Sequence, residues 1–186
     1  MKGILGIIGL IILGSVAQLW IGPNGFGWPA DSFIAWQLRV PRLLLALGAG
    51  AGLAGCGLLL QVLLRNPLAS PYTLGVGSAS ALGASVVMVA IPSASIGFGA
   101  WVGALLATAL VLLLRRRAGL DNEALVLCGI AIALCASAGV LLLHYLADRA
   151  TSSAMLRWTM GGLSSVGIWD GLAGVIPTAI GSFWLL

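Results

Sequence analysis

Long apolar runs, separated by short segments that contain Pro, Gly or charged residues, constrain this chain more than any other feature. Its 186 residues include nine Lys or Arg, five Asp or Glu and one His, and hydrophobic residues make up 60% of the sequence. A soluble globular domain has about a quarter charged residues, and a disordered chain combines low hydrophobicity with high charge. Both classes are excluded, so the sequence predicts a polytopic membrane protein.

The apolar runs predict an all-α transmembrane helix bundle with about six spans. A spanning helix needs about 20 residues, so the chain has room for six spans with short loops and no extramembrane domain. We therefore expect a single transmembrane domain over residues 1–186. Loops are expected at 23–42 and 147–170. The predicted spans cover 3–22, 43–64, 72–91, 98–114, 124–146 and a run from 171 onward.

The orientation follows from the basic residues beside the spans, which concentrate on the cytoplasmic side. With the N terminus inside, five basic residues face the cytoplasm: Lys2, Arg65, Arg115, Arg116 and Arg117. Four then lie outside: Arg39, Arg42, Arg149 and Arg157. The arginine triplet directly abuts a span, where the rule is strongest, so a cytoplasmic N terminus is predicted. The net charge of +4 forms no other basic face, and no nucleic-acid partner is expected.

No set of residues in the sequence resembles an active site or a metal site. The three cysteines, Cys56, Cys128 and Cys135, lie inside apolar runs without CxxC spacing, which indicates packing. None of the carboxylates lies in the middle of a span, which argues against ion-coupled transport, because such transporters usually bury a charge. We predict no catalytic residue, no metal and no cofactor, and a transport path that takes its energy from another source.

An intramembrane hydrolase is the weakest alternative. It needs a serine on a turn such as Gly-x-Ser-x-Gly together with a histidine. Ser164 and His144 are the nearest candidates, but the second glycine of the turn is missing. His144 is explained more simply as a packed or interfacial side chain near the outer end of the span over 124–146. Loss of an activity on changing either residue would support the hydrolase.

Small residues recur at four-residue spacing in several predicted spans. Such ridges let helix backbones approach closely, which matters in lipid, where no hydrophobic effect drives helices together. They predict a tightly packed bundle, and ordinary transmembrane packing explains them. The glycines expected at helix contacts are Gly48, Gly52, Gly75, Gly83, Gly99 and Gly103.

Two polar segments stand out at the ends of the predicted spans. In the first, Arg39-Val40-Pro41-Arg42, the arginines either snorkel to the interface or present donors to a partner's carboxylates, which arginine pairs bidentately. The second, residues 66–71, has prolines at 67 and 71 that forbid a continuous helix. It predicts a rigid turn at the inner mouth, and the sequence does not separate a gating role from a purely structural one.

With these two segments the chain resembles the FecCD-type permeases, the membrane subunits of ABC importers for iron–siderophore, haem and cobalamin. The order and spacing of the motifs agree along essentially the whole sequence, and the Asn-Pro-Leu-Ala block is the most specific of them. The matching segments are RVPR at 39–42, GLLLQ at 57–61, NPLASPYTLGV at 66–76, LCGIA at 127–131 and WTMGGL at 158–163, followed by Trp169.

The resemblance implies a ten-helix permease subunit in the cell inner membrane. It implies three kinds of protein partner: a second permease copy, a cytoplasmic ABC ATPase subunit and an extracytoplasmic substrate-binding protein. Arg39 and Arg42 match arginines that face carboxylates of the binding protein. Asn66, Pro67 and Leu68 on one loop, and Asn122 on another, match the cytoplasmic gate. The lipid bilayer surrounds the subunit, and a separate subunit hydrolyses ATP.

The length departs from this family, whose members exceed 300 residues. The sequence ends inside the sixth predicted span, before the segment that makes the main ATPase contact and before the later helices. We therefore expect the chain to be an N-terminal permease portion that does not transport alone. The alternative is a truncated remnant or an assembly partner in the membrane that does not transport.

Overall fold

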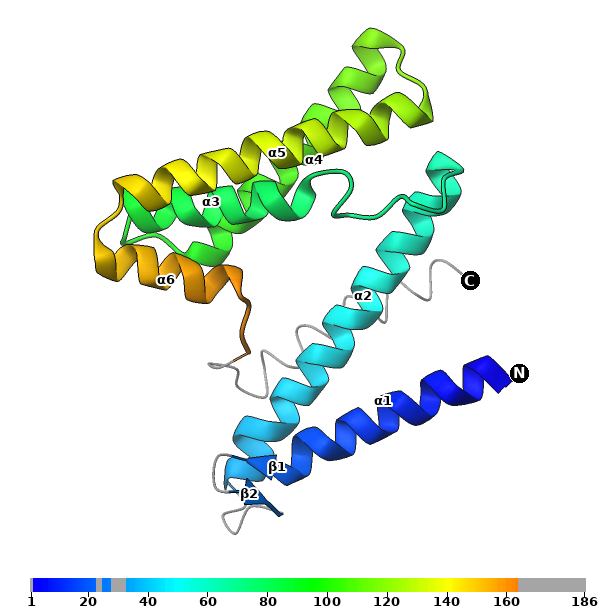
Figure 1. The fold of residues 1–186 in the computed structure, drawn as a ribbon, viewed down its shortest axis with the longest axis vertical. Helices are drawn as coiled ribbons and strands as arrows, with labels where there is room; N and C mark the ends of the chain where they lie inside the picture. The colour runs from blue at the N-terminus through cyan, green and yellow to red at the C-terminus, as the bar shows by residue number, and fades with distance from the viewer. Residues whose placement is uncertain (1, 23–24, 28–32, 164–186) are drawn as a thin grey trace. The chain divides into compact units, whose positions relative to one another are not determined.

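Helices dominate the computed structural model, which describes residues 2–22, 25–27 and 33–163 (Figure 1). The all-α class is confirmed for these residues, and the sixth predicted span lies outside them. The elements, in chain order, are α1 (Lys2–Trp20), β1 (Ile21–Gly22), β2 (Gly25–Phe26), the π-helical segment η1 (Ile34–Arg39), α2 (Val40–Leu64), α3 (Val76–Ala90), α4 (Ile96–Ala118), α5 (Asn122–Leu146) and α6 (Arg149–Thr159).

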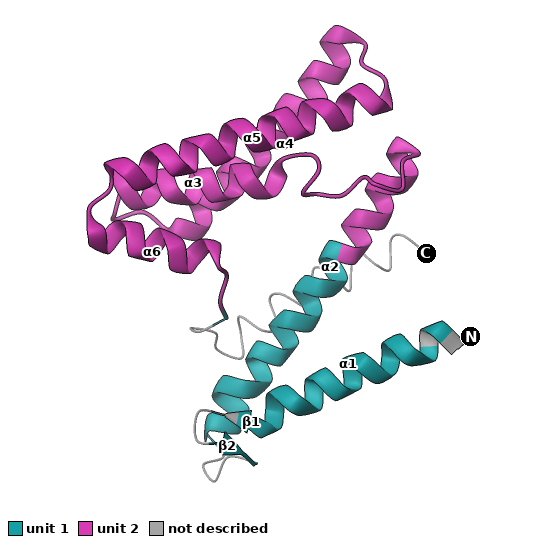
Figure 2. Ribbon diagram, viewed as in Figure 1, with its two compact units in different colours: residues 1–53, 163–186 teal, residues 54–162 magenta. Residues whose placement is uncertain are grey.

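The chain divides into two compact units, and the boundary between them falls within α2 (Figure 2). Unit 1 includes residues 1–53, hence α1, the β1–β2 hairpin, η1 and the first part of α2. Unit 2 comprises residues 54–162, hence the end of α2 and helices α3 to α6. The single transmembrane domain over 1–186 stays a prediction, as does the direction in which the chain crosses the membrane.

Three of the described helical segments are long and apolar enough to cross a membrane: Ile34–Leu64, Ile96–Ala118 and Asn122–Leu146. Shorter apolar helices cover Leu5–Trp20 and Val76–Ala90. Large side chains on α4 and α5 point outward, and Trp101 and Leu134 are 64% and 67% exposed. A soluble monomer rarely exposes such continuous apolar surface, whereas a bilayer solvates it.

The predicted loops over 23–42 and 147–170 both contain helix that the sequence analysis missed. The prediction of a loop over 23–42 is wrong for residues 34–42, because η1 starts at Ile34 and continues directly into α2. The second contains α6, an amphipathic helix of 11 residues, which is too short to span a membrane. Conversely, α3 begins at Val76 rather than at 72, because the segment before it folds into a turn.

The π-helical geometry of η1 has a local cause in Pro41. A proline inside a helix lacks an N–H donor, and its ring clashes with the carbonyl four residues earlier. That carbonyl belongs to residue 37, which lies inside η1, and the N–H of Val40 bonds to the carbonyl of Ala35, five residues back. The widened turn relieves the clash, so one helix continues from Ile34 to Leu64.

Glycines bring α3 and α4 into backbone contact. A Cβ atom added at Gly83 would lie 2.1 Å from the carbonyl oxygen of Gly99, and one at Gly103 would lie 2.2 Å from that of Ala79. Real Cβ atoms essentially never come closer than 3.0 Å to such atoms. The approach therefore requires glycine at these positions, as expected where packing, and not water, holds helices together.

Candidate functional site

The loop between α2 and α3, at one end of unit 2, is fixed by its own hydrogen bonds. Arg65 takes a positive φ of 47° and ends α2. The side-chain oxygen Oδ1 of Asn66 accepts a hydrogen bond from the N–H of Leu68 at 2.9 Å. This Asx-type turn spans Pro67, which has no N–H to donate. This hydrogen bond of Asn66 holds Pro67 and Leu68 in place.

The second half of this loop closes through a reciprocal pair of hydrogen bonds. The N–H of Ser70 donates to Oγ1 of Thr73 at 2.8 Å, and the N–H of Thr73 donates to Oγ of Ser70 at 3.1 Å. The pattern resembles a capping box. Gly75 then takes a φ of +76°, which glycine adopts at little cost, and α3 follows. The loop is therefore an ordered structure.

The start of α5 and the end of α4 pack against this loop. The four side chains at the centre of this "loop cluster" are all less than 9% exposed: Leu64, Ala69, Val111 and Leu125. They come from the end of α2, the α2–α3 loop, α4 and α5, so the two loops predicted at the inner mouth lie at the same end of unit 2. Leu68 stays 77% exposed, Pro67 is exposed, and Asn66 and Asn122 are half-buried.

A close backbone contact also joins the α2–α3 loop to α5. A Cβ added at Gly129 would lie 2.4 Å from the carbonyl oxygen of Thr73 and 2.6 Å from Cα of Leu74. One added at Gly75 would lie 2.7 Å from the carbonyl oxygen of Gly129. The contact therefore tolerates no side chain on either glycine, and a shift of α5 at this level has to move the loop with it.

The α4–α5 loop carries charge that suits both helix ends. Arg115, Arg116 and Arg117 lie in the last turn of α4, where cations interact favourably with the helix dipole. At the start of α5, Oδ1 of Asp121 accepts a hydrogen bond from the N–H of Ala124 at 2.8 Å. Asn122 is the first residue of α5 and follows this cap. The loop thus presents three exposed guanidinium groups beside the loop cluster.

In unit 1, Arg39 binds backbone carbonyls near the β1–β2 hairpin. Its Nη1 atom donates to the carbonyl of Leu19, close to the end of α1, and reaches that of Gly27 at 3.5 Å. A cation at the end of a helix also complements the dipole. Arg42 lies three residues further on, so both arginines project from the same side of the helix, and both are half-buried.

Sequence reasoning missed helix α6, against which His144, predicted as a packed or interfacial side chain, lies. Oδ2 of Asp148 caps α6 by accepting from the N–H of Ala150 at 3.0 Å. Hydrogen bonds from the side chain of Thr151 and the backbone of Ala150 lower the pKa of the Asp148 carboxyl. Nδ1 of His144, on α5, lies 2.9 Å from Oγ of Ser152, on α6, and Met155 is fully buried. The sequence Asp148-Arg-Ala-Thr151 is an N-cap signal that could have revealed this helix.

The structure brings no hydrolytic pair or metal ligands together among the residues it describes. His144 faces Ser152, while Ser164 lies outside the described part of the chain. Within that part, no group of three His, Cys, Asp or Glu side chains could hold a metal ion. Of the six predicted packing glycines, Gly75, Gly83, Gly99 and Gly103 lie at backbone contacts; on α2, Gly48 is buried and Gly52 half-buried.

The sequence of this chain matches a known protein family along nearly its whole length. The FecCD transport family matches residues 3–186, a range that includes both loops of the cluster and both arginines of η1–α2. The chain belongs to the FecCD transport family. The resemblance to FecCD permeases that the sequence motifs indicated is therefore confirmed.

Relatives of this FecCD chain are transporter permeases. An ABC transporter permease protein of Methanocaldococcus jannaschii is 33% identical over 211 residues, which cover 96% of this chain and 60% of the relative. The vitamin B12 import system permease protein BtuC of Escherichia coli strain UMN026 is 31% identical, with 88% of this chain and 51% of BtuC covered. A solved metal-chelate type ABC transporter in an inward-facing conformation gives a TM-score of 0.78 at 29% identity, covering 96% of this chain and 59% of that one.

The FecCD chain spans between about half and three-fifths of the length of these relatives, since it covers 51% of BtuC, 59% of the solved chain and 60% of the archaeal permease. The comparisons identify this chain as the first part of a polytopic ABC permease. They do not identify the chelate.

Proposed function

We propose that this chain acts as the N-terminal portion of a permease subunit in a binding-protein-dependent ABC importer. The observation that carries the proposal is the FecCD match over residues 3–186. ABC permeases are membrane subunits and not enzymes, and a separate ATPase subunit supplies the energy. The absence of mid-span carboxylates in the sequence agrees with that source of energy.

The substrate class in this proposal is a metal chelate: iron–siderophore, haem or cobalamin. Support comes from the relatives, since one is named for vitamin B12 import and the solved neighbour is of the metal-chelate type. The described helices expose mainly apolar side chains and glycine, which hold no chelate by charge. In this proposal the substrate-binding protein selects the chelate.

The loop cluster is the proposed cytoplasmic gate. Asn66, Pro67 and Leu68 on one loop and Asn122 on the other lie at the same end of unit 2, and the Gly129 contact links the first loop to α5. Because α5 and the loop have to move together, a change in α5 along the transport path would open or close this end. Single cysteines at Leu68 and Asn122 test it: their labelling should change when ATP is added to the assembled importer.

Arg39 and Arg42 are the proposed docking residues for the binding protein on the outer face. Arg42→Glu should weaken its capture, most strongly at low salt, where charge attraction is least screened. Arg39→Glu also breaks the carbonyl contacts near Leu19, so its effect has to be compared with its effect on stability. Capture that Arg42→Glu leaves unchanged at low salt would count against docking.

Uptake by cells that lack their own FecCD permease tests the function itself. The cells supply a cognate ATPase and binding protein, and growth on a siderophore, haem or cobalamin is measured. We expect no uptake with this chain alone, and uptake when a second polypeptide supplies the remaining length of a relative. Uptake by the chain alone would contradict the incomplete-permease proposal. Failure to associate with ATPase or permease partners would favour the alternative, a non-transporting remnant.

A further inference from the structure

Arg65 ends α2 in a left-handed backbone conformation that glycine usually occupies. Its φ of 47° is the one positive φ at a non-glycine residue in the part of the chain that the structure describes. The N–H of Arg65 donates to the carbonyl of Val62 at 3.3 Å, and the N–H of Asn66 donates to that of Gln61 at 3.1 Å. These two hydrogen bonds make up a Schellman motif, which closes the C-terminal end of a helix.

The end of α4 has the same backbone conformation, but with glycine. Gly119 follows α4 with a φ of 61°, and its N–H donates to the carbonyl of Arg115 at 3.1 Å. An L-residue in this conformation brings its Cβ too close to the following carbonyl oxygen, whereas glycine has no Cβ. The side chain of Arg65 is exposed, so burial in the described core does not offset the strain. Two helix ends lead into the loops of the proposed gate, and the end of α2 is the strained one.

The first part of the α2–α3 loop, residues 65–68, is held by hydrogen bonds to α2 and to the loop itself. The Schellman pair joins it to α2, and the N–H of Leu68 donates to Oδ1 of Asn66. Pro67 and Leu68 are exposed. Opening of the Schellman pair would therefore release this part from the end of α2.

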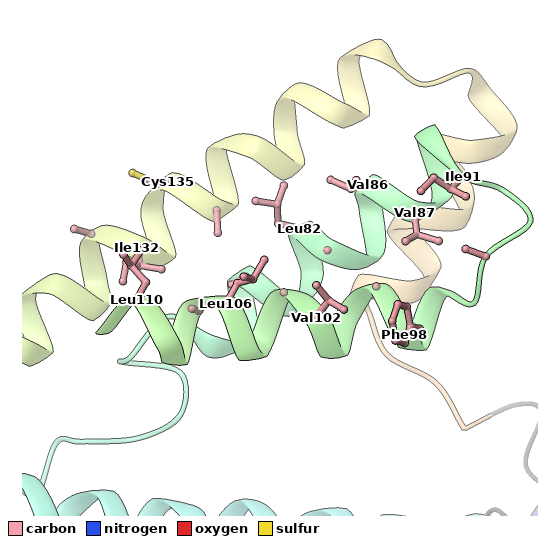
Figure 3. A pocket seen from close by; sticks show the side chains of 18 of the residues that line it. Leu82, Val86, Val87, Ile91, Phe98, Val102, Leu106, Leu110, Ile132 and Cys135 are labelled. Carbon is pink, nitrogen blue, oxygen red and sulfur yellow. The ribbon is translucent and has the colours of Figure 1, made fainter. Parts of the chain in front are cut away.

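The second part of the loop, residues 69–75, is tied to α5. Ala69 is 1% exposed in the loop cluster, and Gly75 is in backbone contact with Gly129. A Cβ added at Gly75 would also lie 3.1 Å from a methyl group of Ile132, which lines an apolar groove formed by α3, α4 and α5 (Figure 3). Bending of the loop relative to α5 is therefore easiest before Ala69, in the part that begins at the strained residue.

We propose that Arg65 is a strained helix cap that serves as the hinge of the α2–α3 loop. While Arg65 keeps its left-handed conformation, residues 65–68 stay folded against the end of α2. When it leaves that conformation, the Schellman hydrogen bonds open, and this part swings while residues 69–75 stay with α5. The strain lowers the free energy needed to reach the open form. The inference rests on the proposed function only in its last step, in which residues 65–68 are the moving part of the gate.

Hydrogen exchange at the amide of Asn66 measures how often the cap opens. The full chain is studied in detergent, and each rate is compared with the intrinsic rate of that sequence. Arg65→Gly should slow exchange about fivefold, because it removes the strain of the closed form. Arg65→Val should speed exchange about fivefold, because a β-branched residue fits a positive φ worse. Arg65→Ala is the matched control, since it removes the charge but keeps Cβ, and it should change the rate by less than about twofold.

Two further amides test where the hinge lies. The N–H of Thr73 lies in the second part of the loop and should exchange equally in all Arg65 variants, because α5 holds that part. Gly119→Arg places at the end of α4 the strain that α2 has, and it should speed exchange at position 119 about fivefold.

The role in gating is measured separately, in the assembled importer. The native cysteines are changed to Ser, and the single cysteine of Leu68→Cys is labelled with and without ATP. Arg65→Gly should reduce the ATP-dependent change in labelling severalfold, because it stabilises the closed cap, whereas Arg65→Ala should keep it.

Several outcomes would overturn the proposal. One is equal exchange at Asn66 in Arg65→Gly, Arg65→Val and the parent, and another is exchange at Thr73 that rises together with that at Asn66. An effect of Arg65→Ala as large as that of Arg65→Gly would mean that charge, and not backbone strain, sets the rate. If the exchange rates are as expected but ATP changes the labelling of Leu68→Cys in no variant, the hinge stands and the proposed gate is wrong. Circular dichroism identifies loss of fold, and the Gly and Ala variants keep the test decisive if Arg65→Val does not fold.

Discussion

Helix α2 and the α3–α4 pair are both rich in glycine, yet three glycines of α2 face open space where glycines of the pair make backbone contacts. On α2, a Cβ added at Gly50, Gly55 or Gly57 would meet nothing within 4 Å. On α3 and α4, a Cβ at Gly83, Gly99 or Gly103 would come within 2.6 Å of another atom. Equal composition thus leads to different structures, because a small residue permits a close approach and does not cause one.

The largest expected effect is at the α3–α4 contact. Gly103→Val should lower the free energy of unfolding by about 3 kcal/mol, because its Cβ alone would overlap the carbonyl of Ala79. Unfolding of the chain in detergent by SDS, followed by circular dichroism, measures it. Gly57→Val on α2 is the matched control and should change stability by less than about 0.5 kcal/mol.

A second control lies on α4 itself and removes any effect of helix propensity. Gly97 has only Ser95 Oγ, at 3.8 Å, near its added Cβ, so Gly97→Ala should leave the fold intact or stabilise it, since Ala favours helix over Gly. Equal losses from Gly103→Val and Gly57→Val would remove the distinction between the two regions.

The second-largest loss of stability is expected where α5 contacts the α2–α3 loop. Gly129→Ala should destabilise by about 1–2 kcal/mol, because the backbone of Thr73 and Leu74 cannot move aside as a side chain can. Gly139→Ala, on the same helix, meets only the flexible end of Leu82 at 2.9 Å and should cost less. Proteolysis of the α2–α3 loop measures the local part. Equal cleavage in both variants would mean that the Gly129 contact does not hold the loop.

Arg39 tests how much its carbonyl contacts hold unit 1 together. Arg39→Gln should cost about 1 kcal/mol, because a half-buried, charge-assisted pair of carbonyl contacts is lost. Hydrogen exchange in α1 and the hairpin measures it, and Arg39→Lys should restore part of the protection. Exchange that stays unchanged in Arg39→Gln would show that other contacts hold the hairpin.

The smallest effect is at the cap of α6. The pKa of Asp148 is lower in the folded chain than in the unfolded one, so its carboxylate stabilises α6 above the unfolded pKa of about 4. This stabilisation is lost as the pH falls through the folded pKa. The thermal midpoint of Asp148→Ala should therefore fall slightly at neutral pH and approach that of the parent in acid. Asp148→Asn keeps a capping oxygen and should lose less. A midpoint difference for Asp148→Ala that does not change with pH would contradict this role.

Much of the fold could be predicted, because apolar runs of spanning length identify membrane helices. The five apolar runs before residue 147 each correspond to a described helix, and the motif at 66–76 correctly placed a turn with prolines. The errors lie where a local rule was overridden or overlooked. The second span was predicted to start at 43, but a π-helical turn accommodates Pro41 and the helix begins earlier. Helix α6 is polar enough to resemble a loop, although Asp148 caps it and Met155 is buried.

The candidate site, too, could be predicted only in part. Its residues were recognisable from motifs, but the hydrogen bond of Asn66 to its own loop, the carbonyl partners of Arg39 and the contact of Gly129 with Thr73 were not. Backbone carbonyls carry no sequence signature, so a pairing such as that of Arg39 with Leu19 has no pattern that could reveal it.

The residues alone identify a helical membrane protein of the FecCD family, because apolar runs of spanning length have few other stable states and the motifs are specific. Which glycines touch and which loops share a core became known only from the packing of the helices. Helix formation depends on neighbours in the chain, whereas close packing depends on which helix faces meet, and many faces of this chain are equally small and apolar.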